Sequence, residues 1–370
     1  MRTSPNVVKD IVENHETPFF LYDSEEIRKS VSELRGALHH QVDVFYSFKA
    51  NPNISICALM LREGVHAEVS SWCELKLADQ IGFKGENIIF VGQGKTEREL
   101  ELAVRLGVFA IVVENSREIE LISSVCEKLN KRARVALRIN PPFQNKSAPL
   151  KMGGVGTQFG LDLSVILKHK EWFQNTSIDL IGLHIYNGTR ILEAHSIVEN
   201  CSKIFSLVRE ICEQIPLDLE ILGLGGGFGV PYFENEISLD LSSLNSGVRD
   251  ELLEFKRDFP AARLIAESGR FLVARSGCLF LKVLYVKESY GKTFAVTDGG
   301  MNCHMAATGV GSFLRRNFPI TRLRPALENE KLEPYTLTGP LCTPSDLIGQ
   351  DVLLPSLAPG DTIQVGMSGA

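Results

Sequence analysis

The feature that most constrains the fold of this chain is a regular alternation of short apolar runs with longer amphipathic stretches. The runs are rich in β-branched and aromatic residues and comprise Val42–Ser47, His66–Val69, Ile88–Val91, Phe109–Val113, Ala133–Ile139, Leu180–Ile185, Leu217–Leu222 and Arg263–Ala266. Most of the stretches between them have helical character, and Ser71–Ile81, Thr96–Leu106 and Ser116–Leu129 open with capping residues. Eight such runs, seven of them followed by a helical stretch, predict a parallel (β/α)8 TIM barrel.

The pattern changes after Arg270. Segments rich in Val, Leu and Tyr, broken by Gly and Pro, follow at Cys278–Val286, Thr293–Thr297, Tyr335–Leu337 and Thr362–Val365. They predict a C-terminal, mostly β domain of sandwich or barrel-like form. We therefore expect a barrel over 24–270 and a β domain made of 1–23 and 271–370, with the short strand Phe19–Tyr22 joining the latter. The Gly- and Pro-rich insert Pro141–Gly160 is expected to form a loop over one face of the barrel.

Composition narrows the class of protein. The net charge of −6 disfavours nucleic acid as a partner, and no stretch is apolar enough to cross a membrane. The 8 cysteines are too scattered for a disulfide framework. The amino-terminal residues lack the apolar segment of a secretory leader. We expect a cytoplasmic protein without membrane or nucleic-acid partners.

Polar residues and glycines collect where the predicted strands end. They are Lys49, Glu68 with Ser70, Gly92–Gly94, Arg138 with Asn140, His184, Gly225–Gly227, and Glu267 with Gly269 and Arg270. Each alone is more simply explained as a turn or a structural residue. Because the active sites of such barrels lie at the carboxyl ends of the strands, their joint placement predicts a catalytic site there.

The glycine-rich segment Leu222–Gly229 predicts a phosphate site, because adjacent glycines let backbone N–H groups converge on an anion. It does not fit a dinucleotide fingerprint, since the third glycine would fall on Phe228 or Val230. Gly94-Lys95-Thr96 similarly imitates a phosphate-binding P-loop, but the first glycine of that motif would have to stand at Ile89.

Lys49 ends an apolar strand and has no acidic residue near it in the sequence. Burial would lower the pKa of this lysine and favour the free amine that forms a Schiff base. The simpler alternative is a lysine that reaches solvent from a strand end. Together with a phosphate cradle and Glu267, however, Lys49 describes a site for pyridoxal phosphate.

The order of motifs resembles that of the alanine-racemase-type, pyridoxal-phosphate-dependent decarboxylases, in the diaminopimelate and ornithine decarboxylase branch. These motifs are Phe48–Asn51, Glu68–Ser70, Gly94–Thr96, Leu137–Asn140, Phe159-Gly160, His184-Ile185, Gly225–Gly229, Glu267–Arg270, Asp298–Met301 and Gly339–Cys342. Within this branch the chain is most similar to the carrier-protein glutamyl decarboxylases of the butirosin pathway. The segments shared with these are Lys151–Val155, Gly229–Phe233 and Pro340–Pro344.

The resemblance implies a role for each matching residue that contacts the cofactor. Lys49 would carry the cofactor as a Schiff base, His184 would stack on its ring, and Glu267 would face the pyridine nitrogen. The phosphate would be held by Gly226, Gly227, Gly269 and Arg270, while Arg138 would support the side of the phenolic oxygen.

Cys342 matches a cysteine that in this family reaches in from the second subunit and returns a proton after carbon dioxide leaves. The resemblance thus implies a homodimer with composite active sites. It also implies an amino-acid substrate, either a small molecule or one linked to a carrier protein or peptide in specialised-metabolite biosynthesis.

Several positions depart from the family pattern. Thr343 stands where diaminopimelate enzymes have an acidic residue, and Asn302–Ser312 lacks their arginine, so the groups that read a distal charge are missing. Tyr186-Asn187 replaces a Gly-Ser pair, and either Asn187 or Thr189 is expected to take over the phosphate contact. The chain ends at Ala370, one residue before a tyrosine found in relatives, which suggests that the β domain shown is incomplete.

Two other functions share this scaffold. A racemase would need a base on each face of the substrate carbon, and a non-catalytic regulatory homologue would have lost cofactor contacts. Cys342 in its Gly-Pro turn fits a decarboxylase better than a racemase, and the presence of both Lys49 and Cys342 argues against a non-catalytic homologue. No metal is expected, because His39-His40 and Cys303-His304 lack the spaced partners of a metal centre.

Overall fold

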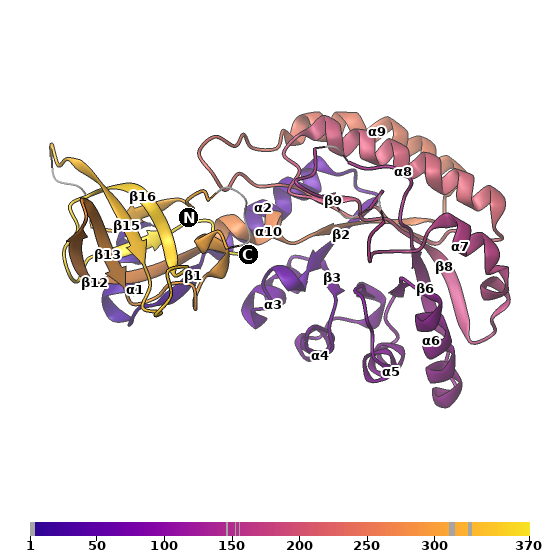
Figure 1. Cartoon of the computed structure of the whole chain (residues 1–370). Helices are drawn as coiled ribbons and strands as arrows, with labels where there is room; N and C mark the ends of the chain where they lie inside the picture. Colours follow the sequence, from indigo (N-terminus) through magenta and orange to yellow (C-terminus); the bar gives the residue numbers. More distant parts are fainter. Residues whose placement is uncertain (1–3, 146, 152, 155, 311–314, 325–327) are drawn as a thin grey trace. The chain divides into compact units, whose positions relative to one another are not determined.

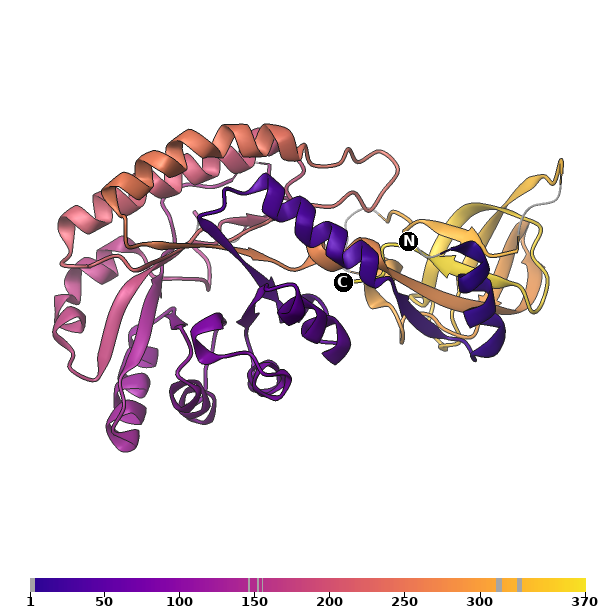
Figure 2. The same ribbon diagram turned by 180° about the vertical axis from the view of Figure 1, so that it is seen from behind.

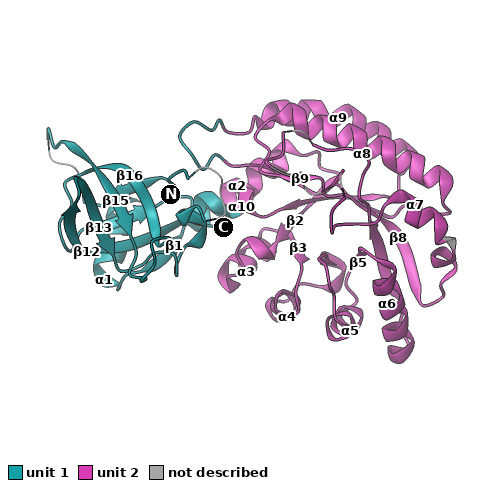
Figure 3. Ribbon diagram, viewed as in Figure 1, with its two compact units in different colours: residues 1–27, 231–237, 273–370 teal, residues 28–230, 238–272 magenta. Residues whose placement is uncertain are grey.

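A computed structural model describes residues 4–145, 147–151, 153–154, 156–310, 315–324 and 328–370. The chain forms two compact units, coloured separately in Figure 3. The barrel unit consists of Arg28–Val230 and Ser238–Leu272, and the β unit of Met1–Ile27, Pro231–Ile237 and Val273–Ala370.

The barrel unit contains a closed ring of parallel strands in the order β10-β11-β2-β3-β4-β5-β6-β8. Figure 1 labels β2, β3, β6 and β8 of this ring. The strands are β2 (Val42–Ser47), β3 (His66–Val69), β4 (Ile88–Phe90), β5 (Ala110–Val113), β6 (Ala133–Arg138), β8 (Ile178–His184), β10 (Ile221–Gly223) and β11 (Arg263–Ser268). The predicted TIM barrel is thereby confirmed. The seventh strand begins at Ile221 rather than at Leu217, because the N–H of Leu217 turns back to the carbonyl of Ile215, 2.9 Å away.

Helices of the barrel unit begin and end where capping residues allow. They are α2 (Ser24–Ala37), which starts in the β unit, α3 (Ile54–Arg62), α4 (Trp72–Ile81), α5 (Glu97–Leu106), α6 (Ser116–Leu129), α7 (Leu163–Lys168), α8 (Ala194–Gln214), α9 (Leu241–Asp258) and α10 (Arg270–Val273). Thr96 and Glu99 form a reciprocal capping box at the start of α5. The long helices α8 and α9 run side by side in both views (Figures 1 and 2). In the part of the chain that the structure describes, no helix has the length and apolarity to cross a membrane.

Nine buried side chains fill the inside of the barrel and hold the strand ends in place. These are Phe45, Ile89, Val91, Ala110, Val112, Ala136, Ile181, Ile221 and Ile265. The insert expected as a loop over one face contains a short strand, β7 (Leu150–Lys151), which pairs with β9 (Gly188–Thr189) directly after β8.

The β unit is built on a seven-stranded, mostly antiparallel sheet. Its strands are β1 (Phe19–Tyr22), β12 (Gly277–Ser289), β13 (Lys292–Thr297), β14 (Ile320–Arg322), β15 (Leu332–Thr338), β16 (Leu347–Pro355) and β17 (Thr362–Val365), with α1 (Pro5–Asn14) beside them. The long strand β12 pairs with β1 and β17 along its first half and with β13 along its second. This confirms the expected C-terminal β domain.

Candidate active site

The carboxyl ends of the barrel strands carry a set of ionisable side chains. Lys49 follows β2, Glu68 lies in β3, Arg138 and His184 end β6 and β8, and Glu267 lies near the end of β11. Parallel pairing places these ends at one rim of the barrel. The sequence prediction that chemistry gathers at this rim therefore has a structural basis.

Lys49 is held by a short turn that continues strand β2. The turn Phe48–Ala50 follows Ser47, and the fully buried ring of Phe48 fixes it to the core. The Lys49 Nζ donates to both carboxylate oxygens of Glu68, at 2.8 and 2.9 Å. The Lys49 side chain is 55% exposed, whereas that of Glu68 is 0% exposed. The amine therefore stands at the boundary between solvent and a buried carboxylate.

The expected low pKa of Lys49 is wrong for the protein without cofactor. Burial does lower the pKa, as predicted, but the charges of Glu68 and Glu267 and the hydrogen bond to Glu68 outweigh it and raise the pKa above its ordinary value. Lys49 is therefore an ammonium at neutral pH. Glu68 is remote in sequence, and it becomes a neighbour only because β2 and β3 pair with Ser47 opposite Glu68. Its carboxylate lies where it can accept the proton that Lys49 must lose to become a nucleophile.

His184 and Glu267 form a buried pair. The Nε2 of His184 lies 2.6 Å from Oε1 of Glu267, and their side chains are only 3% and 2% exposed. Burial by itself raises the pKa of Glu267, but the charge and hydrogen bond of His184, aided by Lys49 and Arg138, lower it. The carboxylate is thus ionised at neutral pH. Among the described residues, no group accepts from or donates to the other ring nitrogen, Nδ1 of His184.

The glycine loop after β10 brings backbone close to the same carboxylate. Gly225 and Gly227 have positive φ angles of 65° and 78°, a conformation that suits glycine. A Cβ added at Gly226 would lie 1.7 Å from the carbonyl oxygen of Glu267. Within the described chain, no backbone carbonyl accepts from the N–H groups of Gly226 and Gly227. The loop therefore offers free donors in a space that a side chain would fill.

Gly269 and Arg270 continue from the end of β11. A Cβ on Gly269 would lie 2.7 Å from that of Ala50, so Gly269 packs directly on the turn that carries Lys49. Arg270 begins α10, and its buried Nη1 has no hydrogen-bond partner in the described part of the chain. A buried guanidinium nitrogen without an acceptor is suited to an anionic ligand.

Asn187 lies buried just beyond β8, in the position expected to replace the family's serine. Its Nδ2 donates to Oδ1 of Asn200 at 2.9 Å. Its Oδ1 is buried and finds no donor among the residues that the structure describes. One of the two hydrogens on Nδ2 is therefore engaged by Asn200, and the other remains for a ligand.

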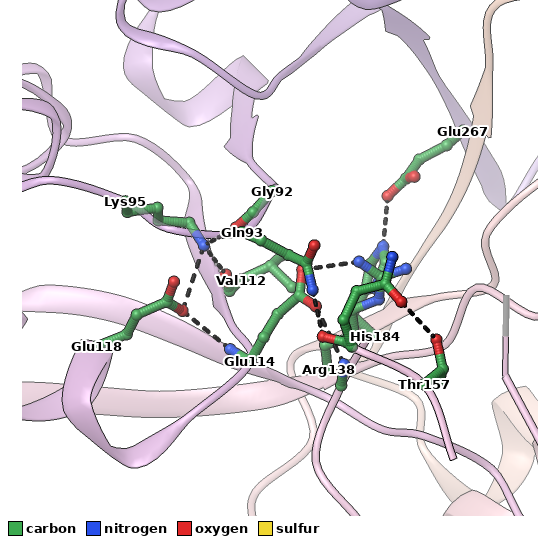
Figure 4. Close-up of polar contacts among 12 residues, drawn as sticks. Gly92, Gln93, Lys95, Val112, Glu114, Glu118, Arg138, Thr157, His184 and Glu267 are labelled. Carbon is green, nitrogen blue, oxygen red and sulfur yellow. Dashed lines mark hydrogen bonds and ion pairs between the residues drawn. The ribbon is translucent and has the colours of Figure 1, made fainter. Parts of the chain in front are cut away.

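Arg138 is nearly fully buried and pairs with a carboxylate that the sequence prediction did not include. Its Nη1 donates to Oε1 of Glu114 at 2.7 Å, and its guanidinium carbon lies 4.7 Å from the ring centre of Phe159. Arg138 stands opposite His184 in the pairing of β6 with β8. Figure 4 shows it between Glu114 and the His184–Glu267 pair.

Cys342 belongs to the β unit, where it is exposed on a loop between β15 and β16. The loop is held by the buried carboxylate of Asp346, which accepts the N–H of Leu341 at 2.7 Å and that of Met301 at 2.5 Å. Met301 ends the segment Asp298–Met301 that the sequence singled out. One buried aspartate thus joins two of the predicted motifs.

The sequence placed Glu68 at the rim without giving it a role, and it did not predict Glu114 or Tyr186 as site residues. Glu68 and Glu114 pair with Lys49 and Arg138. The signal that could have found Glu114 is its position directly after β5, the strand next to β6. Tyr186 stands where the family pattern has glycine, and it packs against Gly225, since a Cβ there would lie 2.9 Å from its ring. Burial raises the pKa of its phenol.

The barrel residues fit pyridoxal phosphate. A lysine amine, an ionised buried carboxylate and a glycine loop with free N–H groups lie at one rim. Buried polar atoms without partners in the described chain, on His184, Asn187 and Arg270, supply further donors and acceptors for a polar ligand. These are the components that a pyridine ring, an aldehyde and a phosphate require.

Comparisons with known proteins agree with this site. Residues 24–274 match the family model described as pyridoxal-dependent decarboxylase, pyridoxal binding domain. The chain is 41% identical over 367 residues to the L-glutamyl-[BtrI acyl-carrier protein] decarboxylase of Niallia circulans. The matched region covers 97% of this chain and 85% of that protein. It is 30% identical to diaminopimelate decarboxylase of Helicobacter pylori, over 98% of this chain and 87% of the relative.

Solved structures give the same picture. Diaminopimelate decarboxylase from Helicobacter pylori complexed with L-lysine superposes with a TM-score of 0.86 at 29% identity, covering 98% of this chain and 89% of that one. The enzyme from Methanocaldococcus jannaschii gives a TM-score of 0.89 at 28% identity, covering 98% and 84%. The family model covers well over half of the chain, and its members use pyridoxal phosphate to decarboxylate amino acids. This chain therefore belongs to the pyridoxal-phosphate-dependent amino-acid decarboxylases.

Proposed function

We propose that the rim residues divide the work on the cofactor as their chemistry suggests. Lys49 holds it covalently, and Glu267 pairs with the ring nitrogen. His184 lies against the ring. When bound, pyridoxal phosphate supplies an electron sink for the α-carbon of the amino acid. The ionised state of Glu267 supports this role, because a carboxylate keeps a facing ring nitrogen protonated.

The phosphate is assigned to the free donors around the glycine loop. These are the N–H groups of Gly226, Gly227 and Gly269 and the side chain of Arg270. Asn187 contributes the second hydrogen of its Nδ2. Arg138 serves the side of the phenolic oxygen, where its fixed positive charge stabilises negative charge.

The proposed substrate is an α-amino acid joined to a carrier protein, of the glutamyl type. The observation that carries this proposal is the 41% identity over nearly the whole chain to an enzyme named for that substrate. The departures from diaminopimelate enzymes support it, since Thr343 and the arginine-free segment Asn302–Ser312 lack the charged residues that those enzymes carry there for a free distal group. A distal carboxyl group that is joined to a carrier protein in a thioester is uncharged, so it needs no charged residue to bind it.

Cys342 is proposed as the donor that returns a proton to the α-carbon, in a homodimer whose partner supplies it. An exposed thiol on a loop anchored by Asp346 supports this, because such a thiol can reach another chain. Sedimentation of the purified protein tests the dimer, and a monomer that remains fully active would contradict composite sites.

The substrate is tested by measuring the release of carbon dioxide from two groups of candidates. The first group contains the free amino acids glutamate, diaminopimelate, lysine and ornithine. The second is a glutamyl unit loaded on an acyl-carrier protein. We expect release from the carrier-linked glutamate at a kcat/KM about 10² or more above that of free glutamate. Faster release from free diaminopimelate would contradict the proposal. Chiral separation of the product and residual substrate distinguishes decarboxylation from racemisation.

A further inference from the structure

Four ionisable side chains lie buried together behind the rim, and only one of them belongs to the proposed cofactor site. Lys95 and Glu118 are 1% and 4% exposed, and Arg138 and Glu114 are 6% and 3% exposed. Figure 4 shows them as a continuous set that ends at Arg138. We call these four residues the buried charge array.

The array begins at Lys95, the residue of the P-loop-like Gly94-Lys95-Thr96. Its Nζ donates to the carbonyl oxygens of Gly92 at 2.5 Å and Val112 at 2.6 Å, and lies 3.4 Å from Oε2 of Glu118. The lysine thereby ties the end of β4 to β5 and to the start of α6. Its Nζ is buried among these acceptors, so Lys95 does not serve as the phosphate-binding lysine of a P-loop.

Glu118 passes the contact on to Arg138 through one residue. The Oε2 of Glu118 accepts the backbone N–H of Glu114 at 2.9 Å. The Glu114 carboxylate in turn accepts from Arg138 at 2.7 Å and from the N–H of Gly160 at 3.0 Å. Lys95 is therefore linked to the guanidinium of Arg138 through Glu118 and Glu114, with the backbone and side chain of Glu114 joining the last two contacts.

The Nζ of Lys95 has three acceptors, the number that an ammonium group can serve with its three hydrogens. With Lys95 as an ammonium the array is electrically balanced, because it holds two cations and two carboxylates in a region where an uncompensated charge is costly. Burial lowers the pKa of Lys95 against the opposing pull of Glu118 and Glu114. Loss of the Lys95 charge would leave a net charge of about −1 next to Arg138, and loss of the Glu118 charge would leave about +1.

A purely structural role does not account for this arrangement. An apolar set of similar volume is commonly as stable as a buried ion network. The Oε1 of Glu118 is buried and has no hydrogen-bond partner among the described residues, and a buried acceptor without a partner destabilises the fold. The array also ends at Arg138, opposite His184 in the strand pairing, where the reaction takes place.

We propose that Lys95 and Glu118 are positioning residues, which set the orientation of Arg138 and the electrostatic potential it brings to the cofactor. Lys95 balances the charge of the two glutamates, so that Arg138 is not drawn further toward them. Glu118 anchors the backbone of Glu114 and thereby the carboxylate that holds Arg138. This inference rests on the proposed placement of the cofactor at the rim.

The test compares Lys95→Met, Glu118→Gln and the double variant, each loaded with pyridoxal phosphate. The long-wavelength absorbance of the bound cofactor changes with pH as the cofactor loses a proton. The pH at which this change is half complete, the midpoint, reports the local electrostatic potential, because a more positive site favours loss of the proton. We expect the midpoint to rise by about 0.5 to 1 unit in Lys95→Met and to fall by a similar amount in Glu118→Gln. The double variant restores neutrality, and its midpoint returns to within about 0.2 unit of the wild type.

Activity gives the second measurement. We expect kcat to fall about tenfold in Lys95→Met with KM changed less than about threefold, and the double variant to recover most of that loss. The proposal would be overturned if the midpoints stayed at the wild-type value or moved in the same direction in both single variants. It would also be overturned if the kcat of the double variant were no higher than that of Lys95→Met.

Folding is controlled separately. Thermal unfolding of the cofactor-free variants identifies any that fail to fold, and Arg322→Met breaks another buried ion pair, with Glu330 in the β unit, at 2.8 Å. Arg322→Met should lower the melting temperature and leave the midpoint unchanged. An equal midpoint shift in this control would overturn the proposal.

Glu118→Gln alone decides the matter if Lys95→Met does not fold, because the amide keeps the shape and the acceptor oxygen. An unshifted midpoint in Glu118→Gln would then overturn the inference. A wild-type protein that forms no absorbance band with pyridoxal phosphate would overturn both the proposed site and this inference. A normal wild-type band with unshifted variants would overturn the inference alone.

Discussion

The two residues proposed to act on substrate and cofactor stand in opposite environments. Lys49 in the barrel unit is bound to a buried carboxylate and lies within the electrostatic reach of Glu267. Cys342 in the β unit is exposed on a loop, and that loop is anchored by backbone donors to Asp346. In the proposed division of roles, the barrel residues act on the cofactor within one chain, whereas the exposed thiol serves a partner chain. Binding and proton return should therefore be separable by mutation.

Lys49→Ala should have the largest effect. The variant loses the amine that holds the cofactor, so we expect the long-wavelength absorbance to disappear and carbon dioxide release to fall more than about 10³-fold. Lys128→Ala, which removes an exposed lysine on α6, is the matched control and should keep both properties. Retention of the absorbance band in Lys49→Ala would show that another amine holds the cofactor.

Cys342→Ala should separate the two regions most clearly. We expect kcat to fall by about 10²–10⁴, the contribution usual for a positioned proton donor, with the cofactor absorbance unchanged. Cys73→Ala replaces the other exposed cysteine and should have wild-type activity. If Cys342→Ala also lost the cofactor, the thiol would belong to cofactor binding and the contrast with Lys49 would fail.

Glu267→Gln should reveal how strongly the barrel depends on buried charge. Burial by itself raises the pKa of Glu267, but the charge and hydrogen bond of His184 outweigh burial, and the pKa in the folded protein is lowered. The ionised carboxylate therefore stabilises the fold, and this contribution is complete above about pH 4.3, the ordinary pKa of glutamate. That contribution is lost as the pH falls through the lowered pKa.

The measurement is urea unfolding of the cofactor-free protein. At pH 7 we expect Glu267→Gln to be about 1–3 kcal/mol less stable than the wild type. The difference should narrow below about pH 4.3. A difference that widens toward acid would mean that the carboxylate is protonated in the folded protein.

Asp346→Ala should have the smallest effect, confined to the β unit. Removal of this buried acceptor leaves the N–H groups of Leu341 and Met301 without their partner, at a cost of about 1–3 kcal/mol in the free energy of unfolding. We expect kcat to fall several-fold, since the Cys342 loop loses its anchor, with no change in cofactor absorbance. Asp250→Ala on the exposed face of α9 serves as the control. An altered absorbance would mean that the loop influences the cofactor directly.

The barrel could be predicted from the sequence because burial of each strand leaves a continuous apolar run. The β unit was harder. Strands β14 and β16 and helix α1 were not predicted, and β16 is interrupted by Asp351 at a positive φ of 52°, which weakens its alternating pattern. The strands of the β unit also pair with partners that are distant in the sequence. For example, β13 pairs in parallel with β15 across 34 intervening residues, from Asp298 to Lys331.

The site divides in the same way. The sequence by itself determined which side chains end the strands, among them Lys49, His184 and Glu267, because the type and order of residues are local properties. The tertiary structure decided what these side chains meet. Glu68 turns the expected free amine of Lys49 into an ammonium, and Lys95 proves to be an internal anchor and not a nucleotide ligand. Protonation and pairing depend on distances between residues remote in the chain, and only the folded barrel sets those distances.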